Sequence, residues 1–136
     1  MWFTRLKTKD KEQRIKANEG YRYDLQRNFR SSMEANVFRF YTQVCRGIQL
    51  CEYEPTVFKI PMGFNGSKTI FYLPDFRITC HDGYQFYVEV KGFMDHSSFR
   101  KIWLAKQTLG LNIFIITPIE YKRIEKNYKH LLKYWE

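Results

Sequence analysis

Three side chains whose types and spacing could do chemistry together are Asp75, Glu89 and Lys91. Apolar and polar residues alternate over residues 84–91, which predicts a strand with Glu89 and Lys91 on one face, about 6.6 Å apart. A turn at residues 82–83 would fold this strand back along the preceding one and carry Asp75 toward the same face. We therefore expect two acids and a lysine to meet at one place.

Two acids and a lysine suit the hydrolysis of a phosphodiester. The carboxylates of Asp75 and Glu89 can hold Mg²⁺, which takes oxygen ligands and keeps several waters, with Mn²⁺ as a substitute. Such a metal turns a water into a usable nucleophile near neutral pH and offsets charge on the phosphate. Lys91 could orient that water or stabilise the same charge. The alternative is a solvated Glu-Lys pair beside an ordinary Pro-Asp turn.

The composition predicts one soluble domain. The chain has 136 residues, 44% of them hydrophobic, and no apolar run near the ~20 residues that cross a bilayer. The N-terminus lacks the apolar core of a signal peptide, so we expect a cytoplasmic protein without membrane contact. Its three cysteines form no Cys-x-x-Cys pair and its three histidines are scattered, which favours reduced thiols over a zinc site.

The net charge of +9 is unevenly distributed along the chain. Residues 1–31 hold nine basic and four acidic side chains, and residues 99–136 hold eight and three. The segment between them holds six basic and seven acidic side chains, and it contains the three candidate residues. Basic flanks around an acidic centre fit a polyanion held on both sides of a metal site, although a general charge excess for solubility gives a similar total.

A helix is predicted to begin at Ser31. Ser31 and Glu34 have the spacing of a capping box, in which the Glu34 carboxylate accepts a hydrogen bond from the Ser31 N–H, and Gly47 marks the helix end. Alternatively, Glu34 delivers a third carboxylate to the metal site, and spacing does not choose between these roles. Upstream, we expect residues 1–20 to form a basic arm, while residues 21–136 form the single domain.

The other predicted elements alternate between strands and helices. In chain order they are strands at 50–54 and 57–60 interrupted at Pro55, a turn at 63–67, one strand over 68–80 bent near Pro74, a helix from Ser97 or Ser98 to Gly110, a strand at 112–117 buried on both faces, and a helix from a capping box at Thr117 to Trp135. The order α-β-β-β-α-β-α predicts an α/β fold with a mixed sheet between helices.

These motifs together resemble the PD-(D/E)xK nuclease superfamily, and within it the phage endonuclease I type of Holliday-junction resolvase. The resemblance covers residues 30–117, and the segments that carry it are Arg30-Ser31-Ser32-Met33-Glu34, Gly47-Ile48, Glu52-Tyr53-Glu54, Tyr72-Leu73-Pro74-Asp75-Phe76, Val88-Glu89-Val90-Lys91-Gly92 and Arg100-Lys101. The span from the first helix to Pro74 is longer here than in that family, with an insertion-like segment at 63–68.

The resemblance implies a restriction-endonuclease-like αβββαβ core whose mixed central sheet is flanked by helices. It implies that Glu34, Asp75 and Glu89 are the acids at the Mg²⁺ sites, with Lys91 as the catalytic lysine and the carbonyl of Val90 as a further ligand. The basic residues expected to contact nucleic acid are Arg30, Arg100, Lys101 and Lys106.

The implied activity is a magnesium-dependent, structure-selective DNA endonuclease, most like a Holliday-junction resolvase that acts on branched DNA in a phage-infected or bacterial cell. The resemblance also implies a homodimer, and residues 51–60 are the natural place for a strand to cross to a partner chain. Two other functions fit the same residues. One is a sequence-specific nicking or restriction endonuclease, and the other is a catalytically inactive DNA-binding module.

Overall fold

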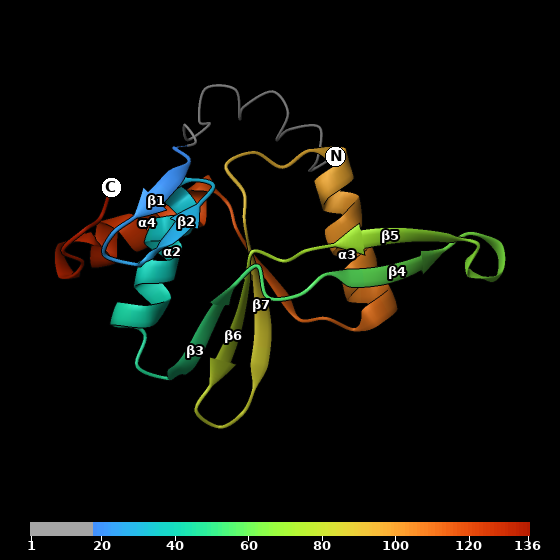
Figure 1. The fold of residues 1–136 in the computed structure, drawn as a ribbon, viewed down its shortest axis with the longest axis horizontal. Helices are drawn as coiled ribbons and strands as arrows, with labels where there is room; N and C mark the ends of the chain where they lie inside the picture. Colours follow the sequence, from blue (N-terminus) through green and yellow to red (C-terminus); the bar gives the residue numbers. More distant parts are fainter. Residues whose placement is uncertain (1–17) are drawn as a thin grey trace.

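The computed structural model describes residues 18–136, so residues 1–17, most of the predicted basic arm, lie outside the described part (Figure 1). The elements in chain order are β1 (Gly20–Arg22), β2 (Arg27–Phe29), α2 (Ser32–Arg39), a π-helical turn (Phe40–Val44), β3 (Ile48–Tyr53), β4 (Phe58–Met62), a 3₁₀ turn (Phe64–Gly66), β5 (Lys68–Tyr72), β6 (Phe76–Cys80), β7 (Gln85–Val90), α3 (His96–Leu109), β8 (Ile113–Ile116), α4 (Pro118–Tyr128) and a 3₁₀ turn (Lys129–Leu131).

A four-stranded mixed sheet of order β3-β6-β7-β8 lies at the centre. The β3/β6 and β6/β7 pairs are antiparallel. The strands β7 and β8 pair in parallel, and α3 connects them along the chain. Helices α2 and α4 lie on one side of the sheet and α3 lies on the other (Figure 1). The predicted α/β class and mixed sheet between helices are therefore confirmed.

Two cores form because the side chains of β7 alternate between the faces of the sheet. Val88 and Val90 belong to the core under α2 and α4, together with Phe38. Tyr87 packs on the other face against the core that contains Ile102 of α3. This alternation is the pattern predicted for residues 84–91, and it turns Glu89 toward the α3 side.

The predicted strand over residues 68–80 is wrong as a single strand. It is divided at Pro74, which is fully buried and has no N–H to continue a ladder, so β5 pairs only with β4 while β6 joins the central sheet. The strands β4 and β5 form a separate hairpin beside α3 (Figure 1). The predicted interruption near Pro55 is confirmed, because β3 ends at Tyr53 and β4 begins at Phe58.

The predictions for the cap of α3 and for the burial of β8 are wrong. Asp95 caps α3, since its Oδ1 accepts a hydrogen bond of 2.7 Å from the Ser98 N–H, and neither Ser97 nor Ser98 is the cap. The strand β8 is not buried on both faces, because Phe114 is 52% exposed. The β1/β2 hairpin begins at Gly20, and the predicted division into an arm and a domain stays a prediction.

Other predicted ends are confirmed or shortened. Gly110 ends α3 in the left-handed conformation, and Thr117 and Glu120 form the predicted capping box of α4 with Pro118 at its first position. α4 stops at Tyr128, earlier than predicted. Cys45, Cys51 and Cys80 are free thiols. Within residues 18–136, no helix has the length and apolar character that crossing a membrane requires.

Candidate active site

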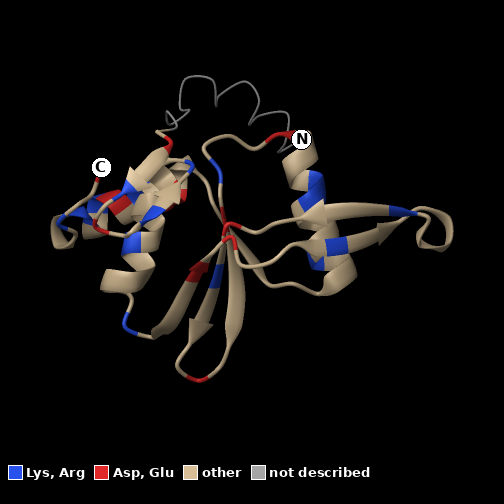
Figure 2. Ribbon diagram, viewed as in Figure 1, with Lys and Arg blue, Asp and Glu red and all other residues tan. Residues whose placement is uncertain are grey.

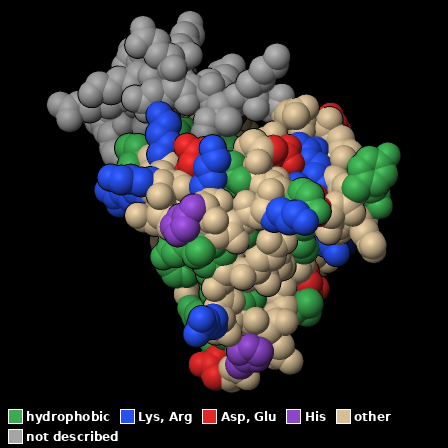
Figure 3. Space-filling view, turned by 90° about the vertical axis from the view of Figure 1, so that its left-hand side faces the viewer, with side chains coloured by type: hydrophobic (Ala, Val, Ile, Leu, Met, Phe, Trp, Pro, Cys, Tyr) green, Lys and Arg blue, Asp and Glu red, His purple; other side chains and the backbone are tan. Residues whose placement is uncertain are grey.

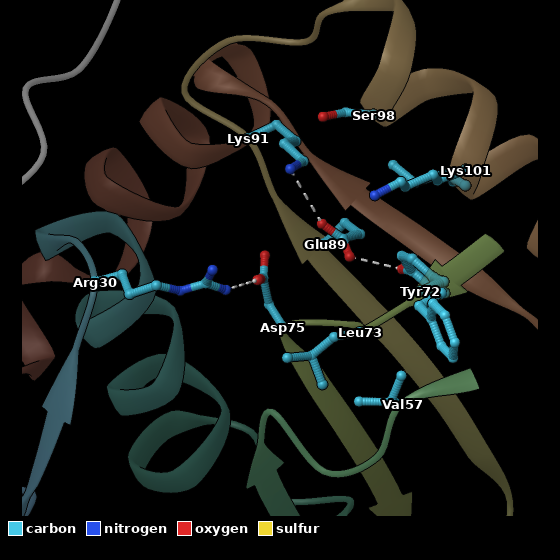
Figure 4. A pocket seen from close by; sticks show the side chains of 11 residues that line it. Arg30, Val57, Tyr72, Leu73, Asp75, Glu89, Lys91, Ser98 and Lys101 are labelled. Carbon is cyan, nitrogen blue, oxygen red and sulfur yellow. Dashed lines mark hydrogen bonds and ion pairs between the residues drawn. The ribbon is translucent and has the colours of Figure 1, made fainter. Parts of the chain in front are cut away.

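A cavity of about 350 Å³ opens where β5, β7 and α3 meet. Five of the charged or hydrogen-bonding side chains that line it are Tyr72, Asp75, Glu89, Lys91 and Lys101 (Figure 4). In Figure 2 acidic residues gather at this centre, and basic residues lie on α3 and the hairpin beside it. The structure therefore brings together the two acids and the lysine that the sequence singled out.

The register of the hairpin β6/β7 places the two acids side by side. Phe76 pairs with Val88 in an antiparallel ladder, so Asp75, one residue before Phe76, falls opposite Glu89. Lys91 follows the end of β7. Its N–H donates a hydrogen bond of 2.9 Å to the carbonyl of Ile116, which fixes the backbone of Lys91 to β8. This confirms the prediction that the turn after β6 folds β7 back along β6 and so brings Asp75 to the face of Glu89.

Each oxygen of Asp75 has a different partner. The carboxylate is buried, with 4% of the residue exposed. Its Oδ2 accepts a hydrogen bond of 2.7 Å from the Val90 N–H, and its Oδ1 accepts one of 3.2 Å from the Arg30 guanidinium. The side chain of Val90 lies in the core on the other face, so Val90 meets the site through its backbone.

The two oxygens of Glu89 also have different partners, a neutral donor on one and a cation on the other. Glu89 is 3% exposed, and its Oε1 accepts a hydrogen bond of 2.7 Å from the Tyr72 hydroxyl. Its Oε2 lies 3.6 Å from Nζ of Lys91. Figure 4 shows Lys91 and Arg30 approaching the two carboxylates from different elements. Each carboxylate thus keeps one oxygen that faces a positive charge and the cavity.

The electrostatics of the pair favour a bound cation. Burial raises the pKa of Asp75, and the charges of Glu89 and Glu34 raise it further, while the Val90 N–H and Lys91 oppose this. Burial likewise raises the pKa of Glu89, against the lowering effect of Lys91 and Tyr72. Two buried carboxylates that repel each other are stabilised as anions by any cation placed between their outward oxygens.

The donor set fits Mg²⁺ as a partly hydrated ion. Within residues 18–136 no three Asp, Glu, His or Cys side chains form a group that could hold a metal. A cation here would therefore rely on Asp75, Glu89 and water. Mg²⁺ is commonly held by one or two carboxylates and retains its other waters, whereas Zn²⁺ requires more nitrogen or sulfur ligands. A contribution from the Val90 carbonyl stays a prediction.

Glu34 lies outside the cavity lining, at the start of α2. Ser31 Oγ accepts a hydrogen bond of 3.1 Å from the Glu34 N–H, as predicted. The Glu34 carboxylate, however, accepts hydrogen bonds from the Tyr53 hydroxyl at 2.6 Å and from the Arg30 N–H at 3.2 Å. The second half of the predicted capping box, the bond to the Ser31 N–H, is therefore wrong. Glu34 is within electrostatic reach of Asp75, and its role as a metal ligand stays a prediction.

Arg30 joins three carboxylates. Its guanidinium lies 3.2 Å from Asp75, 2.8 Å from Glu54 and 4.0 Å from Glu34. Its side chain is 56% exposed, so it can leave these partners without crossing a packed core. Arg30 was predicted as a nucleic-acid contact, and the structure shows it at the edge of the same cavity.

The basic residues of α3 are divided. Lys101 lines the cavity across from Glu89, as does Ser98 (Figure 4). Arg100 and Lys106 are exposed on α3 and are not part of the cavity lining. Only one of the three predicted contacts on this helix is thus next to the two acids.

Sequence reasoning missed Tyr72 and Glu54 as members of the site. Tyr72 precedes Pro74 in the motif, and a tyrosine at the end of a strand next to a Pro-Asp pair was the available signal for a donor to a carboxylate. Glu54 has a positive φ of 48°, a conformation that glutamate rarely adopts. The Glu54 N–H donates a hydrogen bond of 2.7 Å to the Asp75 carbonyl, so this strained residue connects the end of β3 to the site.

The geometry above is the basis for assigning this site, because comparison with known proteins adds no relative: no protein-family model, no curated protein and no solved structure matches the chain.

Proposed function

We propose that the protein is a magnesium-dependent endonuclease of the PD-(D/E)xK type that hydrolyses DNA phosphodiesters and selects branched DNA. The observation that carries the proposal is the buried Asp75–Glu89 pair, in which each carboxylate turns one oxygen toward a cation in an open cavity. Apart from the separate hairpin β4/β5, the order α2-β3-β6-β7-α3-β8 supports it, because this is the αβββαβ order that the resemblance implies for such a core.

The roles of the residues follow from their contacts. Asp75 and Glu89 would hold Mg²⁺, or Mn²⁺ in its place, and the bound ion would supply a water of lowered pKa and offset charge on the phosphate. Val90 and Tyr72 fix one oxygen of each carboxylate, which orients the other toward the cavity. Lys91 lies 3.6 Å from Glu89, where its ammonium can orient a water or bind a phosphate oxygen.

Arg30 and Lys101 would position the DNA backbone. Both line the cavity, and Arg30 is more than half exposed. The planar donors of a guanidinium can exchange a carboxylate for a phosphate, which they can bind with two hydrogen bonds. The net charge of +9 adds the salt-dependent attraction on which binding to any duplex depends.

Basic residues also cover the opposite side of the sheet. α4 and the residues after it expose Lys122, Arg123, Lys126, Lys129 and Lys133. Figure 3, which looks at the α2 and α4 side, shows Lys and Arg side chains dispersed among apolar ones and no single continuous basic patch. The surface of α3, next to the cavity, is therefore the better candidate for the DNA track.

A homodimer with two such sites would match the two symmetric phosphodiesters of a DNA junction. In one chain, Arg30 precedes the predicted crossing segment 51–60, and its partner Asp75 follows it. If that segment crosses to a partner, the contact between Arg30 and Asp75 joins two chains, and each site is composite. Light scattering of the DNA-cleaving species tests this, because a mass near the 16.6 kDa of one chain would exclude the dimer.

A cleavage assay tests the proposed function. Matched four-way junction, flap, duplex and single-stranded DNA are incubated with Mg²⁺, Mn²⁺, Ca²⁺ or EDTA. We expect cuts in the junction with Mg²⁺ or Mn²⁺, none with EDTA, and none by Asp75→Asn, which should still bind DNA. Full activity of Asp75→Asn would reject the site.

The Arg30–Asp75 contact favours one second function, a DNA-binding module without catalysis. In that case the guanidinium permanently occupies the position that a metal would need. Such a module would cut no substrate as the original chain, and only Arg30→Met, which vacates that position, would gain Mg²⁺-dependent cutting. A nuclease with a displaceable arginine would already cut as the original chain, and Arg30→Met would retain measurable cutting with weaker binding. Binding without a cut in every metal and on every substrate would establish the module.

A further inference from the structure

The hairpin β4/β5 is an arm that ends in an exposed aromatic side chain. It projects from the α3 side of the molecule and its tip lies far from the central sheet (Figure 1). Phe64 at the tip is 86% exposed. At the other end of the arm, Val57, Phe71 and Tyr72 line the cavity that holds the two acids.

The arm has a fixed shape. Five consecutive residue pairs, from Phe58–Tyr72 to Met62–Lys68, form its ladder. Its inner side is buried against α3, because Ile60 is 0% exposed and lies in one core with Ile102. The arm therefore holds its tip at a set distance from the active site rather than as a loose loop.

The turn at the tip is also defined. Gly63 and Gly66 have φ of 76° and 69°, and Asn65 between them has φ of 53°. The Ser67 N–H donates 3.1 Å to the carbonyl of Phe64 and closes the turn. With 86% of the residue exposed, the Phe64 side chain is almost uncovered by the described part of the chain.

The charge of the arm selects a polyanion as its partner. Residues 55–74 contain Lys59 and Lys68 and no Asp or Glu. The adjacent residues 96–119 contain Arg100, Lys101 and Lys106 and also no acid. This surface, with basic side chains and no acid, repels the same surface of a second copy and attracts DNA.

We propose that Phe64 probes DNA structure by stacking on a base pair exposed at a branch point, while the neighbouring lysines hold the backbone; this deepens the proposed nuclease function and rests on it. Aromatic side chains stack on any exposed base, and unstacked or branched sites give access at a lower cost than intact duplex. The arm thus supplies the selectivity for branched DNA that the two carboxylates cannot supply.

The length of the arm relates the probe to the cut. Each strand has five residues, which span about 17 Å. This length corresponds to roughly five base-pair steps of about 3.4 Å. For an arm lying along the duplex axis, the cleaved phosphodiester is expected about five base pairs from the base that Phe64 contacts.

The test measures binding in the Asp75→Asn background, so that DNA is not cut. Dissociation constants are measured by fluorescence anisotropy for a four-way junction and for linear duplex of the same sequence, and 2-aminopurine at the branch reports stacking. Phe64→Ala should reduce the preference for the junction by about tenfold and abolish the 2-aminopurine response. Phe64→Trp should preserve both, and so should Leu131→Ala, which removes a side chain 60% exposed on the far side of the sheet.

Unchanged discrimination in Phe64→Ala, an equal loss on junction and duplex, or a fall in molecular mass that marks Phe64 as a dimer contact would each overturn the proposal. The outcome is separable from that of the nuclease proposal. If the otherwise unmodified chain cuts no DNA but the Phe64 effect persists, the nuclease fails and the arm stands. If the otherwise unmodified chain cuts DNA and Phe64→Ala prefers branched DNA to the same degree, the arm proposal fails and the nuclease proposal stands.

Discussion

At the Asp75–Glu89 pair, each carboxylate is held by a neutral donor on one oxygen and approached by a basic side chain on the other. This division fixes one oxygen of each carboxylate and leaves the other beside a basic side chain at the cavity. Such a pair opposes folding when no cation is present, because burial and mutual repulsion both disfavour the charged forms.

A stability measurement checks this strain. The pKa of Asp75 is raised in the folded protein, mainly by burial and then by Glu89. A raised carboxyl pKa contributes stability that is present below the unfolded pKa of about 3.9 and is lost as pH rises through the folded pKa. Asp75→Asn should therefore melt at a higher temperature than the original protein at pH 7 in EDTA, and this advantage should disappear near pH 3. An equal or lower melting temperature at pH 7 would contradict the strain.

Tyr72 is a positioning residue, because its hydroxyl donates a hydrogen bond to the Glu89 carboxylate and holds it in place. Tyr72→Phe removes the donated hydrogen bond of 2.7 Å and keeps the ring, which is 4% exposed. We expect cleavage to fall roughly 10- to 100-fold. The acidic limb of the pH–rate profile should move to higher pH, since the Tyr72 hydroxyl lowers the pKa of Glu89. Tyr84→Phe, at a half-exposed tyrosine outside the cavity lining, is the control. A lower rate with an unmoved pH profile would assign Tyr72 a packing role only.

At the scale of elements, the helix α3 depends on a cap that the sequence pattern misassigned. Asp95, Ser97 and Ser98 are all plausible caps by residue type. The structure uses Asp95, and the hydrogen bond from the Ser98 N–H lowers the pKa of its carboxyl. Asp95→Ala should cost about 0.5–2 kcal/mol in urea unfolding at pH 7, while Ser97→Ala should cost almost nothing. Equal losses in both variants would show that the cap is shared.

Local sequence was sufficient where an element is determined by its own residues. The alternation of β7 placed Glu89 and Lys91 on one face, and the capping box at Thr117 placed the start of α4. It failed where a distant partner decides. The sequence of residues 68–80 predicts a bend at Pro74, but distant strands decide how the two halves pair, so β5 joins β4 while β6 joins the central sheet. Likewise, Glu34 has the spacing of a capping acid, but Tyr53, 19 residues away, takes its carboxylate.

At the scale of the whole molecule, Glu136 ties the last residues to the first hairpin and to α2. Its carboxylate accepts hydrogen bonds from Arg22, Arg39 and Ser32. The tie spans 114 residues of sequence between Glu136 and Arg22, so it closes the domain on the side away from α3. Glu136 does not line the cavity of Asp75 and Glu89, and its ion pairs serve the fold.

The pH dependence of unfolding should reveal this tie. Burial would raise the pKa of Glu136, but the hydrogen bonds from Arg22, Arg39 and Ser32 lower it to about 2. A lowered carboxyl pKa contributes stability that is present above the usual value of 4.5 and is lost as pH falls toward 2. Glu136→Gln should therefore cost about 1–2 kcal/mol at pH 7, a value reduced for the 25% exposure of the side chain, and less at pH 3. A loss that does not change with pH would reject the charge-based account.

The claim on which the proposed function depends is that Asp75 and Glu89 together hold a divalent cation. Titration with Mn²⁺, followed by electron paramagnetic resonance, measures this without DNA or catalysis. We predict that the original protein binds Mn²⁺, that Mg²⁺ competes, and that Asp75→Asn and Glu89→Gln each weaken binding by at least about tenfold. Glu52→Gln, which removes a surface carboxylate paired with Arg77, should bind as the original protein does. Absence of Mn²⁺ binding in the original protein, or equal binding by all four chains, would contradict the claim.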